Sequence, residues 1–457
     1  MKSKFNLHSD DSSLTRRQFL RNSSIAVAAA TAATKLPFVL TSHATPDDPI
    51  RIGVIGCGGR GTGAVLDALG AATKVVYPDA GYHTETVQEG AAVNRKDIQV
   101  LALCDMFPDR LNNCREQLKK LGINIPDEMC FTGFDGYKKL LAVPEINYVI
   151  QATPPHFRPQ HLLDAIKAGK NVFIEKPAAV DPSGVRMVIE AGELAKQKNL
   201  GIVAGTQRRH RHTYVEAIKR LQDGAIGEIL TARCYWNGGV IWVVERQPGW
   251  TDMEWQLRNW NYFTWIGGDH IVEQHVHNLD IMNWALGHPL KAYGMGGRQG
   301  RQHPIHGHIY DHFAIEFEYP NGVRMFSQCR QMHGCEGRVG EGFVGSKGTA
   351  WLADGTNMIL PKGGSTFRTR SSDDTNPYHQ EHLDLMASIR SGQPLNVAQT
   401  VAESTLTGIM GREAAYSGQT IEWDDALNSK MRLGPEKYEL GSLPFPAVAM
   451  PGQYKFI

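Results

Sequence analysis

The sequence predicts an α/β domain with a doubly wound parallel sheet, followed by an α+β domain with a large, mostly antiparallel open sheet. Three observations support this fold class. Strand-like and helix-like segments alternate over residues 50–206, a glycine-rich loop separates the first strand from the first helix, and strand patterns dominate residues 207–457. A chain of 457 residues, 42% of them apolar, is long enough to bury two such cores.

The first domain begins with an apolar strand over residues 50–55. Strands alternating with amphipathic helices imply right-handed βαβ crossovers and therefore a parallel sheet, which we expect to end near Gly205. The further expected strands are 98–105, 147–153, 171–177 and 200–205, and the expected helices are 108–122, 136–143, 159–169 and 183–197.

The pattern changes after Gly205. Segments 228–236, 289–297 and 311–331 have the alternation and β-branched content of strands. Asn321-Gly322 divides the last of them and is typical of a two-residue hairpin turn. The second domain is therefore expected to contain a mostly antiparallel sheet.

Three glycines follow the first strand in the spacing Gly56-x-Gly58-x-x-Gly61 and lead into a helix-compatible segment. Without side chains the backbone can turn tightly and approach a pyrophosphate, which then lies on N–H groups at the positive end of the helix. An ordinary glycine-rich turn is the alternative. The position between strand and helix favours a Rossmann dinucleotide site that also includes Gly59 and Arg60.

Asp105 ends the second strand, where a carboxylate can accept hydrogen bonds from an adenosine ribose and repels a 2′-phosphate. This favours NAD over NADP. Asp105 lies 44 residues after Gly61, although about 20 is usual. We attribute the excess to an insertion over roughly residues 73–97, which contains the loop-like stretch 77–90.

Residues 1–44 resemble a twin-arginine signal, with Arg16 and Arg17 ahead of a mild, alanine-rich run over 22–34. That run is too short to span a bilayer, and Ser42-His43-Ala44 offers a small-x-small cleavage site. The signal predicts that the protein is exported in its folded state, and hence a periplasmic location.

Charge and cysteine content exclude several classes of partner. Six of the 48 basic residues and two of the 47 acidic residues lie in the signal, which leaves 42 and 45 in the mature chain. A net charge near −3 without a basic run argues against nucleic acid or an anionic membrane surface as partner. Seven cysteines without a C-x-x-C pair indicate neither a disulfide framework nor a structural zinc site.

Four ordered motifs extend over nearly the whole mature chain: the glycine motif, ATPP at 152–155, GKNVFIEKP at 169–177 and GGDHIVEQHVHNLD at 267–280. In this combination the chain resembles the Gfo/Idh/MocA family, which includes glucose–fructose oxidoreductase and inositol dehydrogenase. The resemblance implies an NAD-binding Rossmann domain over 50–206. It also implies a substrate-binding and oligomerisation domain over 207–457, which forms dimers or tetramers through the open antiparallel sheet.

The resemblance also assigns site residues. It places Lys176 beside the nicotinamide and the substrate hydroxyl, and it matches an Asp and a His four residues apart on a helix with Glu273 and His277. Two positions differ further from the family pattern: His275 replaces a common small residue, and Arg158 stands where a His often follows the T-P turn. The remaining cofactor contacts that it implies are Thr153, Pro154, His156 and Glu175.

The chemistry of alcohol oxidation explains these residue types. A base must take the hydroxyl proton while hydride leaves the carbon, and the neutral imidazole of His277 is a suitable acceptor at neutral pH. Glu273, at i−4 on a helix, would orient the ring and stabilise its charged form. The Lys176 ammonium would polarise the substrate oxygen. The alternatives are a salt-bridging lysine at a strand end and a histidine on a helix surface.

The histidines of the 267–280 motif invite a metal interpretation. His270, His275 and His277 lie close to Glu273 and Asp280 in the sequence. Steps of two and five residues nevertheless point the three rings in different directions on a helix, so we expect no metal here.

Substrate contacts are expected from the aromatic stretch before that motif. Flat indole faces suit the apolar faces of a sugar ring, while neighbours such as Asn237 and Arg258 would bind its hydroxyls. An oligomer interface or a satellite core is the alternative for any one tryptophan. The QRRH run at 207–210 follows the last parallel strand and could meet a ligand or form a solvated basic face. The predicted substrate contacts are Arg209, Trp236, Asn237, Trp260 and Asp280.

These observations predict an exported, NAD-dependent oxidoreductase acting on a secondary hydroxyl of a sugar or glycoside. Free NAD is not expected outside the cytoplasmic membrane, so the cofactor should be bound before export and regenerated in place. One alternative is a redox-neutral, NAD-dependent glycosidase that oxidises, eliminates, rehydrates and reduces. The other is a non-catalytic carbohydrate-binding protein on a degenerate fold.

Overall fold

The computed structural model describes residues 49–71, 73–77, 82–87, 93, 95 and 97–456, with the backbone alone for 73–77, 82–87 and 371. The predicted signal and its cleavage site lie outside the described residues. Within the described part of the chain, no helix has the length and apolar character needed to cross a membrane.

The predicted parallel sheet is present and has six strands in the order β5-β4-β1-β6-β7-β8. All of its pairings are parallel. The short strand β5 has no counterpart among the strands expected from sequence, since only three residues form it. The strands are β1 (Ile50–Ile55), β4 (Ile98–Asp105), β5 (Cys130–Thr132), β6 (Tyr148–Gln151), β7 (Asn171–Ile174) and β8 (Ile202–Ala204).

Helices cover both faces of this sheet, as a doubly wound fold requires. Ala64 of α2 and Leu111 of α3 belong to one apolar core, whereas Leu140 of α4, Leu162 of α5 and Val185 of α6 belong to the other. The helices are α2 (Gly59–Ala68), α3 (Pro108–Lys120), α4 (Gly136–Leu141), α5 (Arg158–Lys167) and α6 (Pro182–Lys198).

Two short strands lie within the predicted insertion. β2 (Thr73–Tyr77) and β3 (Tyr82–Val87) pair with each other in an antiparallel ribbon between α2 and β4. The expectation of a loop over 77–90 is therefore wrong for Tyr77, the last residue of β2, and for residues 82–87, where Tyr82, Thr84 and Thr86 alternate as in a strand.

The second sheet has nine strands in the order β16-β15-β14-β13-β9-β12-β11-β10-β17. Only β9 and β12 pair in parallel, so the expected mostly antiparallel sheet is confirmed. The strands are β9 (Ile229–Gly238), β10 (Lys291–Gly297), β11 (His312–Glu318), β12 (Arg324–Gln331), β13 (Arg338–Gly345), β14 (Gly348–Leu352), β15 (Met358–Pro361), β16 (Phe367–Arg368) and β17 (Ile421–Glu422).

The predicted hairpin joins β11 and β12. Glu318 pairs with Arg324, and the Tyr319 N–H bonds to Val323 O, so the loop contains three residues, 320–322, instead of the two expected. Within it, Asn321 and Gly322 both have positive φ, 64° and 76°. Asparagine and glycine are the residues that adopt it at least cost.

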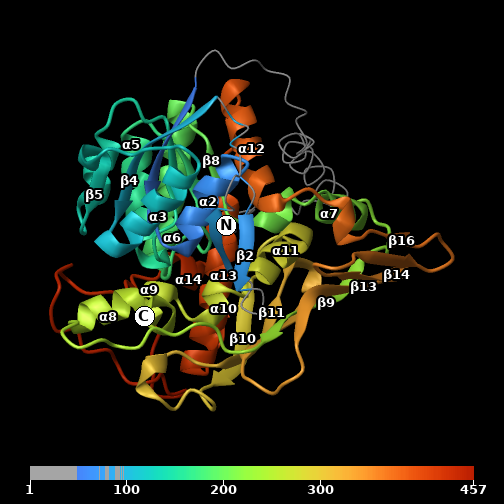
Figure 1. The fold of residues 1–457 in the computed structure, drawn as a ribbon. Helices are drawn as coiled ribbons and strands as arrows, with labels where there is room; N and C mark the ends of the chain where they lie inside the picture. The colour runs from blue at the N-terminus through green and yellow to red at the C-terminus, as the bar shows by residue number, and fades with distance from the viewer. Residues whose placement is uncertain are drawn as a thin grey trace, which may run out of the picture. The chain divides into compact units, whose positions relative to one another are not determined.

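Two C-terminal helices return to the first domain. α12 (Pro377–Arg390) packs against α2, and α13 (Ala398–Ser417) packs against both α6 and β10 (Figure 1). The contact with α6 is close, because a Cβ built on Gly192 would lie 2.6 Å from Cβ of Ala398. Through the packing of α12 on α2, Tyr378 of α12 comes to lie near the carboxyl ends of the parallel strands.

Candidate active site

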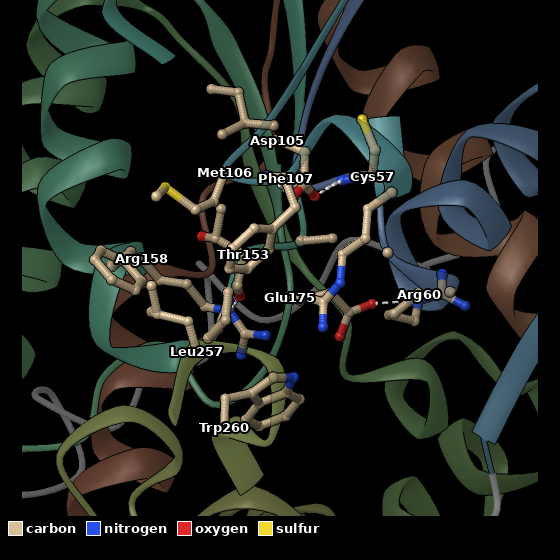
Figure 2. Close-up of a pocket in the computed structure, with 18 of the residues that line it drawn as sticks. Cys57, Arg60, Asp105, Met106, Phe107, Thr153, Arg158, Glu175, Leu257 and Trp260 are labelled. Carbon is tan, nitrogen blue, oxygen red and sulfur yellow. Dashed lines mark hydrogen bonds and ion pairs between the residues drawn. The ribbon is translucent and has the colours of Figure 1, made fainter. Parts of the chain in front are cut away.

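A cavity of about 590 Å³ lies at the carboxyl ends of the parallel strands, where ligands of doubly wound sheets bind. Both halves of the chain line it. Figure 2 shows Asp105, Met106 and Phe107 on one side of the cavity and Leu257 and Trp260 on the other.

The glycine motif forms one wall and has the geometry of a pyrophosphate site. Gly56 has φ +93°, and a Cβ on it would lie 2.7 Å from Ala152 C. A Cβ on Gly61 would lie 1.7 Å from Gly56 O, so the turn closes tightly onto α2. A Cβ on Gly58, in contrast, would meet no atom within 4 Å. Gly58 thus borders open space at the N-terminus of α2, as a bound dinucleotide requires.

Asp105 lies where the ribose of such a dinucleotide is held. Its Oδ2 accepts a hydrogen bond from the Cys57 backbone N–H at 2.7 Å (Figure 2). Its Oδ1 accepts one from the Phe107 N–H at 2.9 Å. Burial raises the pKa of the Asp105 carboxyl, and the two hydrogen bonds partly offset this rise because they stabilise the carboxylate. A carboxylate accepts about four hydrogen bonds, so lone pairs stay available for a ribose diol.

Arg60 and Glu175 line the cavity but bind each other. Arg60 Nε donates to Glu175 Oε1 at 2.7 Å, and Oε2 accepts the backbone N–H of Lys176 at 3.1 Å. The Arg60 guanidinium also lies 5.1 Å from the ring centre of Tyr378, which comes from α12. This buried pair connects the glycine loop to the strand end that carries Lys176.

Of the remaining predicted cofactor contacts, two line the cavity and one does not. Thr153 and Pro154 line the cavity, whereas His156 is not among its lining residues. His156 Nε2 lies 2.7 Å from Tyr438 Oη, beside the ring of Trp265. Burial lowers the pKa of His156 to about 4, so its imidazole is neutral at pH 7.

The single helix expected to carry both Glu273 and His277 is wrong, because the helix is broken after Glu273. α10 (His270–Glu273) ends there and α11 (Val276–Leu286) begins three residues later. The His277 N–H bonds to Gln274 O instead of to Glu273 O, as an unbroken helix would require. The break therefore leaves the Glu273 carbonyl available to another donor.

Lys176 is that donor. Its Nζ donates to Glu273 O at 2.8 Å and to Glu273 Oε1 at 3.0 Å. The Glu273 carboxylate thus binds Lys176 and not His277, which corrects the role expected from i,i+4 spacing. An ammonium has three N–H groups, so one of them is left for a ligand in the cavity.

His277 lies in the same cavity as Lys176 and Glu273. Its ring stacks on Trp236 with centroids 5.7 Å apart and planes 25° apart. Burial, together with the nearby charges of Lys176 and Arg208, lowers the pKa of His277 well below its usual value. The imidazole is therefore neutral at pH 7.

The other two histidines of the motif face elsewhere. His270 Nδ1 lies 3.0 Å from Asp269 Oδ1, and His275 Nε2 lies 2.7 Å from Ser327 Oγ. Within the described residues, no group of three or more potential metal ligands is close enough to hold an ion.

The predicted substrate contacts divide into two groups. Trp260 lines the cavity, whereas Arg209, Trp236, Asn237 and Asp280 do not. Arg209 and Asp280 form an ion pair, with Nε 2.8 Å from Oδ2. Trp236 instead stacks on the ring of His277.

Several lining residues were not predicted. Gln207 belongs to the QRRH run and Trp242 to the tryptophan-rich stretch, so the sequence carried a signal for both. No sequence pattern indicated Tyr378, because only the tertiary fold brings α12 close to the glycine loop. In the described part of the chain, Thr153 Oγ1 and Gln207 Oε1 are buried atoms without a hydrogen-bond partner.

The fold and this cavity define a dinucleotide-dependent enzyme. Residues 50–205 match the model of the family described as "Oxidoreductase family, NAD-binding Rossmann fold", and residues 214–351 match that of the GFO/IDH/MocA C-terminal domain. Together the matches cover well over half of the chain. The chain belongs to the Gfo/Idh/MocA oxidoreductases, and the expected family, enzyme class and NAD cofactor are confirmed.

Individual relatives are distant. Inositol 2-dehydrogenase 3 of Saccharopolyspora erythraea is 28% identical over 273 residues, 57% of this chain and 72% of that protein. 2,7-Anhydro-N-acetylneuraminate hydratase of Escherichia coli is 26% identical over 202 residues, 44% of this chain and 50% of that protein.

Solved structures share the fold. Scyllo-inositol dehydrogenase from Lactobacillus casei, with bound cofactor NAD(H) and scyllo-inositol, superposes with a TM-score of 0.58 at 18% identity. The match covers 82% of this chain and all of that one.

Proposed function

We propose that the protein oxidises a secondary hydroxyl of a sugar or glycoside with NAD, at the site formed by Lys176, Glu273 and His277. The observation that carries this proposal is the shared cavity: the three side chains line the same space as the glycine motif and Asp105. An inositol dehydrogenase among the relatives supports a polyol or sugar as substrate.

Each side chain has a role that follows from its environment. NAD supplies the hydride acceptor when bound. Neutral His277 takes the hydroxyl proton, since its lowered pKa keeps it unprotonated at pH 7. The third N–H of Lys176 stabilises the developing charge on the substrate oxygen, and Glu273 positions the ammonium for that purpose.

Two buried acceptor groups suit a polyhydroxylated substrate. Thr153 Oγ1 and Gln207 Oε1 border the cavity, and neither makes a hydrogen bond within the described residues. Substrate hydroxyls would satisfy them. Trp242 and Trp260, whose rings meet edge to face at 5.7 Å, add the apolar surface that a sugar ring requires.

Export with a captive cofactor completes the proposal. Arg16 and Arg17 belong to a predicted signal for export in the folded state, which an enzyme that must bind NAD in the cytoplasm requires. The cofactor is then regenerated in place, either by a second substrate or by return of hydride to the first. We further propose a homo-oligomer, a dimer or tetramer, in which the open face of the nine-stranded sheet forms the contact.

The test is to purify the mature enzyme and to screen sugars by nicotinamide absorbance. A sugar that reduces bound NAD, followed by accumulation of a keto-sugar with an added acceptor, supports net oxidation. Absence of any absorbance change with a broad sugar panel contradicts catalysis and favours a carbohydrate-binding protein.

Redox-neutral glycoside cleavage is the second candidate. The Escherichia coli relative, named as a hydratase, favours it, because hydration is a step of elimination and rehydration chemistry. A base such as His277 serves either reaction. Release of an aglycone without accumulation of a keto-sugar would select this candidate over net oxidation.

A further inference from the structure

One wall of the cavity is formed by the tryptophan-rich stretch in which we expected substrate contacts. We call residues 239–262 the roof segment. Trp242, Leu257, Arg258 and Trp260 of this segment line the cavity. Three hydrogen bonds between side chains and main-chain groups connect different parts of this segment. Val244 N–H donates to Asn259 Oδ1 at 2.9 Å, Trp255 Nε1–H donates to Val244 O at 2.9 Å, and Tyr262 O–H donates to Ile241 O at 3.1 Å.

The roof segment reaches the end of the cavity that Asp105 marks. Because a carboxylate at this strand end binds the adenosine ribose, the residues that follow it line the adenosine half of the cleft. Phe107, Asp109 and Arg110 are such residues, and all three border the cavity. Lys176 and His277 mark the opposite, reacting half.

A two-pronged ion pair closes the roof over this adenosine half. Arg258 Nη1 lies 2.9 Å from Asp109 Oδ2, and Nη2 lies 3.1 Å from Oδ1. The same guanidinium lies 3.9 Å from the ring centre of Phe107 and 4.8 Å from that of Trp250. Arg110 Nη2 donates to Arg258 O at 3.3 Å, so the contact involves two residues of α3.

We propose that the roof segment covers the adenosine side of the NAD site through Leu257 and Arg258, and that the Asp109–Arg258 pair latches it there, so that NAD leaves only when the pair breaks. This rests on the proposed function, in which NAD is retained through export. The latch supplies a physical reason for that retention, because the Asp109–Arg258 contact joins the two walls that enclose the adenosine half.

The latch lies at the cavity mouth, where it can open. The Asp109 side chain is 61% exposed and that of Arg258 14%. A partly exposed ion pair in this position is screened by salt. NAD release from the enzyme should therefore accelerate as ionic strength rises.

The experiment measures the rate of NAD release from purified holoenzyme into buffer with an NAD scavenger. Asp109→Asn should accelerate release by about tenfold, the value of one charge-assisted contact, and should weaken its salt dependence. Arg258→Lys keeps the charge but loses the two-pronged geometry, so its release rate should be intermediate.

Glu254→Gln is the matched control. Glu254 Oε1 accepts from Arg258 Nε at 3.1 Å, but both residues lie on the short helix α8 (Asp252–Arg258), so this pair does not bridge the cleft. Release from Glu254→Gln should stay within about twofold of the unchanged enzyme, the effect expected of a helix surface pair. Melting temperatures of the NAD-free variants report any general loss of stability.

Two results would overturn the latch: release from Asp109→Asn at the original rate, or equal acceleration in Asp109→Asn and Glu254→Gln. A purified enzyme that contains no NAD would instead contradict the captive cofactor. The latch would then be measured on enzyme loaded with added NAD, so the two failures are distinguishable.

Discussion

The Lys176 ammonium is held by both the main-chain oxygen of Glu273, at 2.8 Å, and its carboxylate, at 3.0 Å. The first bond exists because the helix breaks after Glu273 and leaves its carbonyl without an intrahelical donor. The position of Lys176 therefore depends on the backbone of the motif as well as on the side chain at residue 273.

Substitutions at these two positions should differ in severity. Lys176→Ala removes the group that stabilises the substrate oxygen, and turnover should fall by about 10² to 10³, the loss typical of one such donor. Glu273→Gln keeps the main-chain bond, so turnover should fall only about tenfold. Rates with the best sugar, alongside the amount of bound NAD, check both values. Equal losses in the two variants would contradict a main-chain anchor for Lys176.

The two histidines provide a second comparison. His277→Ala should lower turnover by about 10² to 10⁴, as expected for loss of a general base, with NAD still bound. His275→Ala removes the bond to Ser327 outside the cavity, and should lower the melting temperature while the folded enzyme keeps its turnover. The opposite pattern would assign the chemistry to His275.

Local patterns made the parallel sheet and its helices predictable. Hydrophobic periodicity and turn residues are properties of short stretches of sequence. They predicted each end of α6 to within one residue and the hairpin at Asn321. The break after Glu273 was not predictable, because HIVEQHVHNLD is helix-compatible throughout. The carbonyl that the break exposes is satisfied by Lys176, a donor 97 residues away that no local pattern indicates.

Assigning the tryptophans required the tertiary structure too. The sequence offered six of them in one stretch without distinguishing their surroundings. Trp255, Trp260 and Trp265 all belong to one buried cluster, and of these three only Trp260 lines the cavity, together with the partly buried Trp242. Arg258, expected to bind substrate hydroxyls, instead pairs with Asp109.

The glycine motif should separate folding from cofactor binding. A Cβ on Gly61 would lie 1.7 Å from Gly56 O, so Gly61→Ala should distort the turn and destabilise even the NAD-free protein. Gly58→Ala should leave the melting temperature of the NAD-free protein unchanged and weaken NAD binding, because its new methyl group enters open space beside the loop. Calorimetric titration with NAD and thermal unfolding measure the two effects. Unchanged NAD affinity in Gly58→Ala would contradict pyrophosphate binding at this loop.

Buried neutral histidines should make the protein sensitive to acid. His308 is buried beside the ring of Phe445, and burial lowers its pKa to about 4. In the unfolded chain a histidine has a pKa of about 6.5 and binds a proton below that pH. The free energy of unfolding therefore falls as pH decreases from about 6.5 to about 4 and is independent of this group above about 7.

The variant His308→Phe isolates this contribution, since the ring lies between aromatic neighbours outside the cavity. Buried carboxyls with a raised pKa, such as Glu341 at about 7, act in the opposite direction but cancel in the difference between variant and parent. Relative to its value at pH 7, the parent should lose up to about 3 kcal/mol more than His308→Phe by pH 4. Urea unfolding at several pH values measures the difference. A difference that does not change between pH 7 and pH 4 would mean that His308 has the same pKa in the folded and the unfolded protein.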